Sequence, residues 1–168
     1  MAEELAEFVF LKPGELFTGQ SPARVKTVLG SCVAITVRDR RLGLAAMAHC
    51  LLPEAGAPAD ELPRQEALRF VDTTIDLLLN AFRRQGARAG DLEIKLFGGA
   101  DGLSLDPQSG AGVGSRNVDA AHALLAARGF TPAAAVVGGR RGRVIEFDTE
   151  SGEVRVRVLP QTPRKGRR

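Results

Sequence analysis

The sequence predicts a single-domain α+β fold, a mixed α/β sandwich of largely antiparallel β-sheets with two main helices packed on them. Strand-like and helix-like segments follow one another in the order strands, helix, strand, helix, strands. Residues 64–84 and 115–128 have the apolar spacing of helices, whereas the other apolar segments are short and end in turn signals. No internal repeat and no linker divides the chain.

The composition is that of an ordinary globular domain. The chain has 168 residues, enough for one domain with a substantial core, and it is 44% hydrophobic and 26% charged. Eight Phe and no Trp or Tyr predict a mostly aliphatic core. We expect residues 1–160 to form the domain and residues 161–168 to be a basic, disordered tail.

The net charge of +3 comes from that tail. The tail contains four basic residues, Arg164, Lys165, Arg167 and Arg168. Without them the chain has 19 basic and 20 acidic residues. The folded body is therefore nearly neutral, and we expect the tail to be solvated and to bind no nucleic acid.

The sequence predicts a cytoplasmic protein with no direct membrane insertion. The first eight residues are acidic where a signal peptide is basic, and no apolar run reaches the roughly 18 residues that span a bilayer. Two cysteines make neither a disulfide framework nor a zinc-binding spacing. No metal or cofactor is expected, and each cysteine is either a small buried hydrophobe or a reactive thiol.

Two short strands are expected at the start of the chain, at residues 8–11 and 25–29. The turn signal Lys12-Pro13-Gly14 follows the first strand, and Gly30-Ser31 ends the second just before Cys32. Glycine at position 30 lets the backbone turn tightly and approach a substrate closely. It also leaves the amides of Ser31 and Cys32 available to stabilise an oxyanion.

Residues 33–37 and 44–52 are expected to form a hairpin across the charged break Asp39-Arg40-Arg41. In a symmetric hairpin with Arg40 and Arg41 at its tip, Cys32 faces His49 with Cβ atoms about 5 Å apart. A thiol beside an imidazole is the minimum equipment for nucleophilic acyl chemistry. A bulge at Gly43 is the feature that would shift this register.

The middle of the chain contains the clearest helix, at residues 64–84, after a loop at residues 53–63. Six apolar residues are spaced to lie on one face of it: Leu68, Val71, Ile75, Leu78, Leu79 and Phe82. Gly86 and Gly90 close the helix. A strand at residues 92–97 and a long glycine-rich loop at residues 98–114 follow.

Ser115 is expected to cap a second helix that runs to Arg128, with Gly129 as its stop. Its inward residues would be Val118, Ala121, Leu124 and Leu125. The remaining segments are a strand at residues 131–137, a basic glycine loop at residues 138–142, and a hairpin of residues 144–147 and 154–158.

Cys32 with His49 is the cysteine–histidine pair that the local geometry favours. Cys50 is adjacent to His49 and would point to the opposite face of a strand, and His122 would lie on the surface of the second helix. A nearby imidazolium would lower the pKa of the Cys32 thiol. The Thr27 hydroxyl would orient the far nitrogen of His49, although the same residue also fits as a plain β-branched strand residue.

Two further glycine-containing segments have a functional and a structural interpretation each. The run from Gly110 to Gly114 superficially resembles a dinucleotide fingerprint, but no strand immediately precedes it, so a substrate-facing or packing loop is preferred. Arg116 and Asn117 would support that loop by hydrogen bonding. Residues 138–143 would contact an acidic partner or form a solvated turn.

Five segments together resemble one known family, the bacterial CheD chemoreceptor glutamine deamidases. They span most of the chain in the family's order: LGSCVAITVRD (29–39), MAHCLLP (47–53), KLFGGA (95–100), GSRNV (114–118) and GGRRGRVIEF (138–147). The sequence departs from the family pattern at Cys50, where a bulky apolar residue is usual, and at Val136, where an acidic residue is frequent. Thr27 is the only candidate for the family's catalytic threonine.

The resemblance implies a protein-glutamine glutaminase in which Cys32 is the nucleophile and His49 the base. Its substrates would be glutamines on the cytoplasmic helices of chemoreceptors, hydrolysed through a thioester without a cofactor. The candidates for the oxyanion site and the substrate loop are Gly30, Ser31, Gly98, Gly99, Arg116 and Asn117. One alternative is a non-catalytic binding module that docks both on chemoreceptors and on a CheC-type phosphatase. The other alternative is a different kind of cysteine hydrolase.

Overall fold

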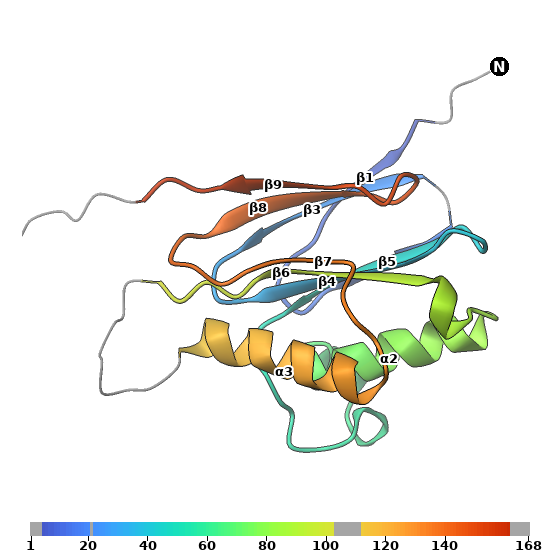
Figure 1. Ribbon diagram of the computed structural model, residues 1–168, viewed down its shortest axis with the longest axis horizontal. Helices are drawn as coiled ribbons and strands as arrows, with labels where there is room; N and C mark the ends of the chain where they lie inside the picture. Colours follow the sequence, from blue (N-terminus) through green and yellow to red (C-terminus); the bar gives the residue numbers. More distant parts are fainter. Residues whose placement is uncertain (1–4, 21, 103–111, 162–168) are drawn as a thin grey trace, which may run out of the picture.

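The computed structural model describes residues 5–20, 22–102 and 112–161, which form three layers (Figure 1). Two β-sheets are stacked, and the two long helices cover the free face of one of them. The prediction of an α+β sandwich with two main helices is confirmed.

One sheet, here called the outer sheet, has the strand order β1-β3-β8-β9. Its strands are β1 (Glu7–Phe10), β3 (Ala23–Leu29), β8 (Arg143–Asp148) and β9 (Val154–Val158). The pairs β3–β8 and β8–β9 are antiparallel, and β1 lies parallel to β3. Alternate residues of β3 are buried, which leaves the other face of this sheet open to solvent.

The other sheet, here called the central sheet, has the order β2-β5-β4-β6-β7. Its strands are β2 (Leu16–Gly19), β5 (Leu44–Cys50), β4 (Val33–Asp39), β6 (Leu92–Gly98) and β7 (Ala134–Val137). All pairs are antiparallel except β6–β7. Strands β4 and β5 are buried on both faces because this sheet lies between the outer sheet and the helices.

Two apolar clusters hold the layers together. Ala34, Met47 and Phe97 belong to the cluster between the two sheets. Val33 and Ile35, which alternate with Ala34, belong to the cluster under the helices. Strands β4, β5 and β6 therefore each have residues facing the outer sheet and residues facing the helices.

The predicted helix at residues 64–84 is two helices, α1 (Arg64–Ala67) and α2 (Val71–Arg84). Phe70 between them is extended and forms a parallel bridge with Leu52, and the amides of Leu51 and Leu52 both donate to the Arg69 carbonyl. This tertiary pairing breaks the helix at a point where the sequence shows no helix breaker. The short 3-10 turns η1 (Ala59–Glu61) and η2 (Ala89–Asp91) flank the pair.

Helix α3 (Val113–Ala127) begins two residues before the predicted start, so the prediction that Ser115 caps it is wrong. The Ser115 amide and hydroxyl donate instead to the carboxylate of Asp101. Sequence analysis also missed strand β2. Residues 103–111 of the predicted glycine-rich loop and residues 162–168 of the predicted tail lie outside the described residues.

The predicted register of the β4–β5 hairpin is wrong by two residues. His49 pairs with Ala34, and the last pair before the loop is Asp39 with Leu44. The loop thus has four residues, ends at Gly43 with φ +63°, and is closed by a hydrogen bond from the Gly43 amide to the Arg40 carbonyl. A shift of two residues keeps every side chain on its face.

Candidate functional site

Cys32 lies just before β4, at the edge of the cluster between the two sheets. It is partly buried, whereas the preceding Gly30 and Ser31 are exposed. Cys32 comes two residues before Ala34, the cross-strand partner of His49, so Cys32 and His49 are diagonal neighbours on one face. The predicted direct pairing is replaced by a diagonal one.

His49 is 2% exposed and points from β5 towards the outer sheet. Its Nδ1 lies 2.7 Å from the hydroxyl oxygen of Thr27, which is fully buried on β3. The same hydroxyl donates to the Leu11 carbonyl at 2.8 Å. The contact between Thr27 and the far nitrogen of His49, which the sequence predicts, is present.

These two hydrogen bonds fix the tautomer of His49. A hydroxyl has one proton, and a carbonyl oxygen accepts only, so the Thr27 proton lies on the Leu11 side. Nδ1 of His49 must then carry the proton that it donates to Thr27. Nε2 is left with a lone pair, and it is buried with no hydrogen-bond partner among the described residues.

The turn between β1 and β2 holds the backbone of His49. The Gly14 amide donates to the His49 carbonyl at 2.8 Å, and the His49 amide donates to the Glu15 carbonyl at 3.1 Å. Sequence analysis identified Lys12-Pro13-Gly14 only as a turn and gave no role to Leu11 or Glu15. Contacts of this kind depend on which elements meet in the folded structure, and local sequence patterns do not predict them.

Gly98 and Gly99 hold the backbone of Cys32 from the other side. The Gly99 amide donates to the Cys32 carbonyl at 2.8 Å, and a Cβ added at Gly98 would lie 2.2 Å from the same carbonyl oxygen. The φ angles of +99° and +67° at these residues also favour glycine. The Gly99 amide is therefore already used, which removes it from the candidate oxyanion donors.

Asn117 joins the segment that carries Cys32 to the segment that follows His49. Its side chain is fully buried, and its Nδ2 donates to the Ser31 carbonyl at 2.9 Å and to the Leu51 carbonyl at 3.0 Å. The neighbouring Arg116 is exposed and lines a shallow hollow with Glu54. Of this predicted pair, only Asn117 hydrogen bonds to the segments around Cys32 and His49.

Burial keeps both Cys32 and His49 neutral. It raises the pKa of the Cys32 thiol, against a smaller opposing effect of its own backbone amide. It also lowers the pKa of His49 to about 4, although the negative charge of Glu15 acts in the other direction. The expected lowering of the thiol pKa by an imidazolium is not found.

The second cysteine and the second histidine have other surroundings. Cys50 is fully buried under the helices, and burial raises its pKa to about 12. Cys50 and His49 thus face opposite sides of the sheet, as predicted. His122 is exposed on α3.

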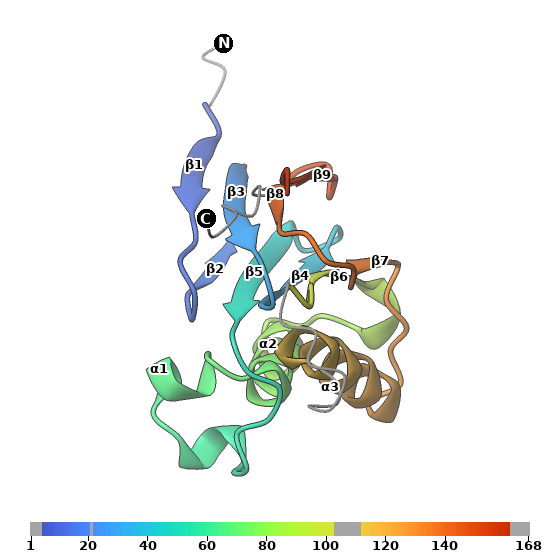
Figure 2. The ribbon, with the colours of Figure 1, turned by 90° about the vertical axis from the view of Figure 1, so that its left-hand side faces the viewer.

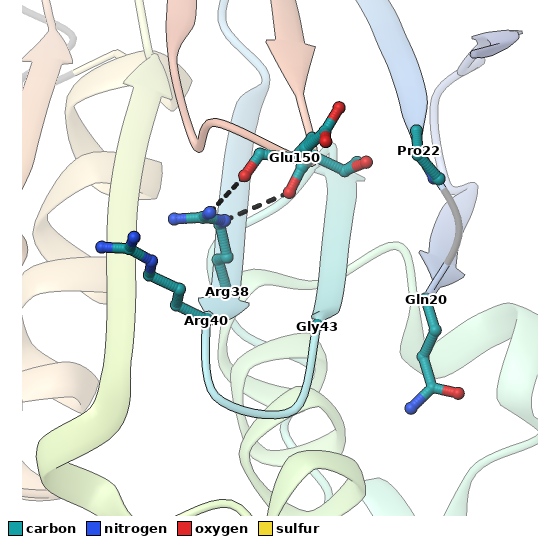
Figure 3. Close-up of a pocket in the computed structure, with 7 residues that line it drawn as sticks. Gln20, Pro22, Arg38, Arg40, Gly43 and Glu150 are labelled. Atoms are coloured by element: carbon teal, nitrogen blue, oxygen red, sulfur yellow. Dashed lines mark hydrogen bonds between the residues drawn. The ribbon is translucent and has the colours of Figure 1, made fainter. Parts of the chain in front are cut away.

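A hollow of about 290 Å³ lies near the tip of the β4–β5 hairpin, at the end of the strands remote from Cys32 (Figure 3). There Arg38 donates to the carbonyls of Thr149 and Glu150 and ties the central sheet to the β8–β9 hairpin. The lining residues include no cysteine and no histidine: Gln20, Pro22, Arg38, Arg40, Gly43, Thr149 and Glu150. This hollow has no nucleophile of the kind found at the other end.

A metal centre and a membrane-spanning helix are both absent from the described ranges. No group of three or more His, Cys, Asp or Glu residues there has the geometry to hold a metal ion. None of the helices within these ranges has the length and apolar character needed to cross a bilayer.

Comparison with known proteins gives a consistent family. The family model described as CheD chemotactic sensory transduction matches residues 51–158, which leaves Cys32 and His49 before the matched range. A probable chemoreceptor glutamine deamidase CheD 2 of Geobacter sulfurreducens is 46% identical over 92% of this chain and 91% of its own length. A probable chemoreceptor glutamine deamidase CheD of Maridesulfovibrio salexigens is 44% identical over 90% and 91%.

More distant proteins follow. The chemoreceptor glutamine deamidase CheD of Thermotoga maritima is 34% identical over 87% of this chain and 88% of its own length. A crystal structure of the Bacillus licheniformis hypothetical protein YfiH covers 83% of this chain and 62% of that chain, with 12% identity and a TM-score of 0.44.

Proposed function

Because the chain belongs to the CheD family, we propose that it hydrolyses the side-chain amide of particular chemoreceptor glutamines and converts them to glutamate. The relatives that match it over nine tenths of its length are named as chemoreceptor glutamine deamidases. The observation that carries the proposal is the Thr27–His49 hydrogen bond, which leaves Nε2 of His49 as a base on the face where Cys32 lies.

In the first step, the Cys32 sulfur attacks the carboxamide carbon while Nε2 of His49 takes the thiol proton. Since burial favours the neutral form of both groups, the proton moves during the attack and not before it. The imidazolium that forms donates through Nδ1 to Thr27. A neutral hydroxyl stabilises this cation less than a carboxylate would, which suits a histidine that must give its proton up again.

In the second step, the imidazolium gives its proton to the departing ammonia and leaves a Cys32 thioester. Nε2 of His49 then takes a proton from water, which attacks the thioester carbon and releases glutamate and the thiol. The oxyanion in both steps would be held by the amide of Cys32, which lies beside its own sulfur, together with that of Ser31. Gly30 has no atom within 4 Å of the position of a Cβ, so substrate backbone has room to approach.

Asn117 acts in this proposal as a positioning residue. Its two amide hydrogens bond to the carbonyl of Ser31, which directly precedes Cys32, and to the carbonyl of Leu51, which comes two residues after His49. A side chain from a third element, α3, therefore links the segment that carries Cys32 to the segment that follows His49.

The product adds one negative charge to a chemoreceptor, and this change would bias signalling. We place the reaction in the cytoplasm, on the cytoplasmic helices of the receptors. A CheC-type phosphatase is a further proposed partner, which a pull-down with the purified phosphatase would test.

The test is to incubate the protein with a receptor cytoplasmic fragment and to measure fragment masses. Deamidation adds about 1 Da for each glutamine. No gain in mass would leave only a docking role for the chain, and cleavage of the fragment would indicate a peptidase.

A further inference from the structure

We propose that the groove beside the loop of residues 138–142 binds a carboxylate of the protein substrate, close in space to the glutamine that is deamidated. The proposal deepens the proposed function and rests on it. The groove measures about 660 Å³, and its lining residues are Gly139, Arg140, Arg141, Arg143, Val158 and Gln161.

The loop lies next to the segments that hold Cys32. The Gly138 amide donates to the Gly98 carbonyl, and Gly98 packs against the Cys32 carbonyl. The Asp101 amide donates to the Gly139 carbonyl, and the Ala100 amide donates to the Gly30 carbonyl. The loop is therefore close enough to Cys32 for a helix that presents a glutamine there to extend over it.

The loop is held at its base by Arg143. This side chain is 6% exposed, and its guanidinium donates to the carbonyls of Val136 and Gly138. Gly138 and Gly139 have φ angles of +80° and +78°, which set the turn. Arg140 and Arg141 are thus presented from a fixed backbone, which lowers the entropy lost on binding.

The positive charge of this groove is not neutralised by the described part of the protein. Arg140 and Arg141 are exposed and form no ion pair or hydrogen bond there, and Arg143 bonds only to carbonyls. The acidic residue bonded to the loop, Asp101, turns its carboxylate to Ser115. Guanidinium groups bind carboxylates through two parallel hydrogen bonds, so an acidic side chain is the complementary ligand.

The substrate class follows from this charge. Residues three or four positions apart lie on the same face of a helix. A glutamine with a glutamate at such a spacing presents its amide to Cys32 and its carboxylate to Arg140 and Arg141. Each deamidation also creates a glutamate, which makes a glutamine one turn away a better substrate.

The test uses a receptor cytoplasmic fragment whose deamidated glutamine has been mapped by mass spectrometry. The residues three and four positions to either side of it are made all Glu or all Ala. Both fragments are assayed with the unchanged protein, with Arg140→Glu/Arg141→Glu, and with the control Arg40→Glu/Arg88→Glu. The control carries the same change of charge on two exposed arginines at the other end of the central sheet, where Arg40 follows the last residue of β4 and Arg88 precedes η2 and the start of β6.

For the unchanged protein, kcat/KM should be about threefold to thirtyfold higher with Glu than with Ala, and less so at high salt. The Arg140→Glu/Arg141→Glu variant should lose this preference, and the control should keep it within about twofold. Equal rates on both fragments, or equal losses in both variants, would overturn the groove as a carboxylate site. The affinity of Cys32→Ala for the two fragments provides the same comparison without turnover. A failure to deamidate would contradict the proposed function, whereas equal affinities for the Glu and Ala fragments would overturn the groove as a carboxylate site.

Discussion

The Thr27 hydroxyl, on the outer sheet, accepts the Nδ1 proton of His49, on the central sheet, at 2.7 Å. This contact crosses the interface between the sheets and links the stacking of the sandwich to the protonation of one ring. The outer sheet thereby decides which nitrogen of His49 is left as a base (Figure 2 shows β3 beside β5).

Replacing Thr27 by Val should leave the site assembled but poorly oriented. The variant keeps the side-chain shape, but Nδ1 of His49 and the buried Leu11 carbonyl lose their partner, at about 1–3 kcal/mol of unfolding free energy. We expect kcat/KM to fall at least about tenfold, part of the 10²–10⁴-fold that general acid–base catalysis contributes. Urea unfolding and steady-state kinetics measure both, and Thr27→Ser should recover most of the activity. Full activity in Thr27→Val would exclude an orienting role.

The acid limb of the pH–rate profile should lie unusually low. His49 acts as a base only when neutral, and burial lowers its pKa from 6.5 to about 4. As the pH falls, kcat/KM should therefore hold through pH 6.5 and decline only as the pH approaches 4. A midpoint at or above 6.5 would show that the ring is not desolvated in the way that the structure indicates.

The two cysteines should differ sharply in thiol reactivity. Cys32 is partly exposed with a raised pKa, and Cys50 is fully buried with a pKa raised to about 12. In the folded protein the Cys32 thiol should react with iodoacetamide, and faster as the pH rises. The Cys50 thiol should react only after unfolding. Mass mapping after iodoacetamide treatment identifies them, and a Cys32 reaction midpoint below the unperturbed value of about 8.5 would instead indicate a resting ion pair.

Gly98 and Gly86 form a matched pair of substitutions. Both have positive φ, +99° and +90°, but a Cβ at Gly98 meets the Cys32 carbonyl oxygen at 2.2 Å whereas a Cβ at Gly86 meets nothing within 4 Å. Both Ala variants incur the backbone strain of about 1–2 kcal/mol. Gly98→Ala should lose a further ~1–3 kcal/mol of stability and most of its activity, because the Cys32 backbone must move. If Gly98→Ala and Gly86→Ala changed the melting temperature and the activity by the same amounts, the close approach of Gly98 to the Cys32 carbonyl would be contradicted.

The residues that local patterns reveal were predicted well. Period-2 and period-3.6 spacing located most of the strands and the two long helices, and the hairpin brought Cys32 and His49 to one face even with the wrong register. The register error arose because a four-residue loop ending at Gly43 replaced a two-residue one. The break between α1 and α2 was missed because it depends on Phe70 pairing with Leu52, a contact between segments that the sequence does not connect.

The site shows the same division. The contact between Thr27 and His49 was predicted because Thr27 lies in the strand that precedes the Gly-Ser-Cys turn. The Gly14 and Glu15 contacts to His49, and the bridge that Asn117 makes, depend on tertiary packing. The pKa shifts were beyond prediction for the same reason, since they arise from burial between layers.

Deamidation in H₂¹⁸O with a matched pair of cysteine variants tests the central claim most directly. Water attack on a Cys32 thioester should place one heavy oxygen in each new glutamate, a gain of about 3 Da for each site. The unchanged protein and Cys50→Ala should both produce it, and folded Cys32→Ala should produce none. Persistent deamidation by Cys32→Ala, with its circular dichroism spectrum unchanged, would contradict the assignment of Cys32 as the nucleophile.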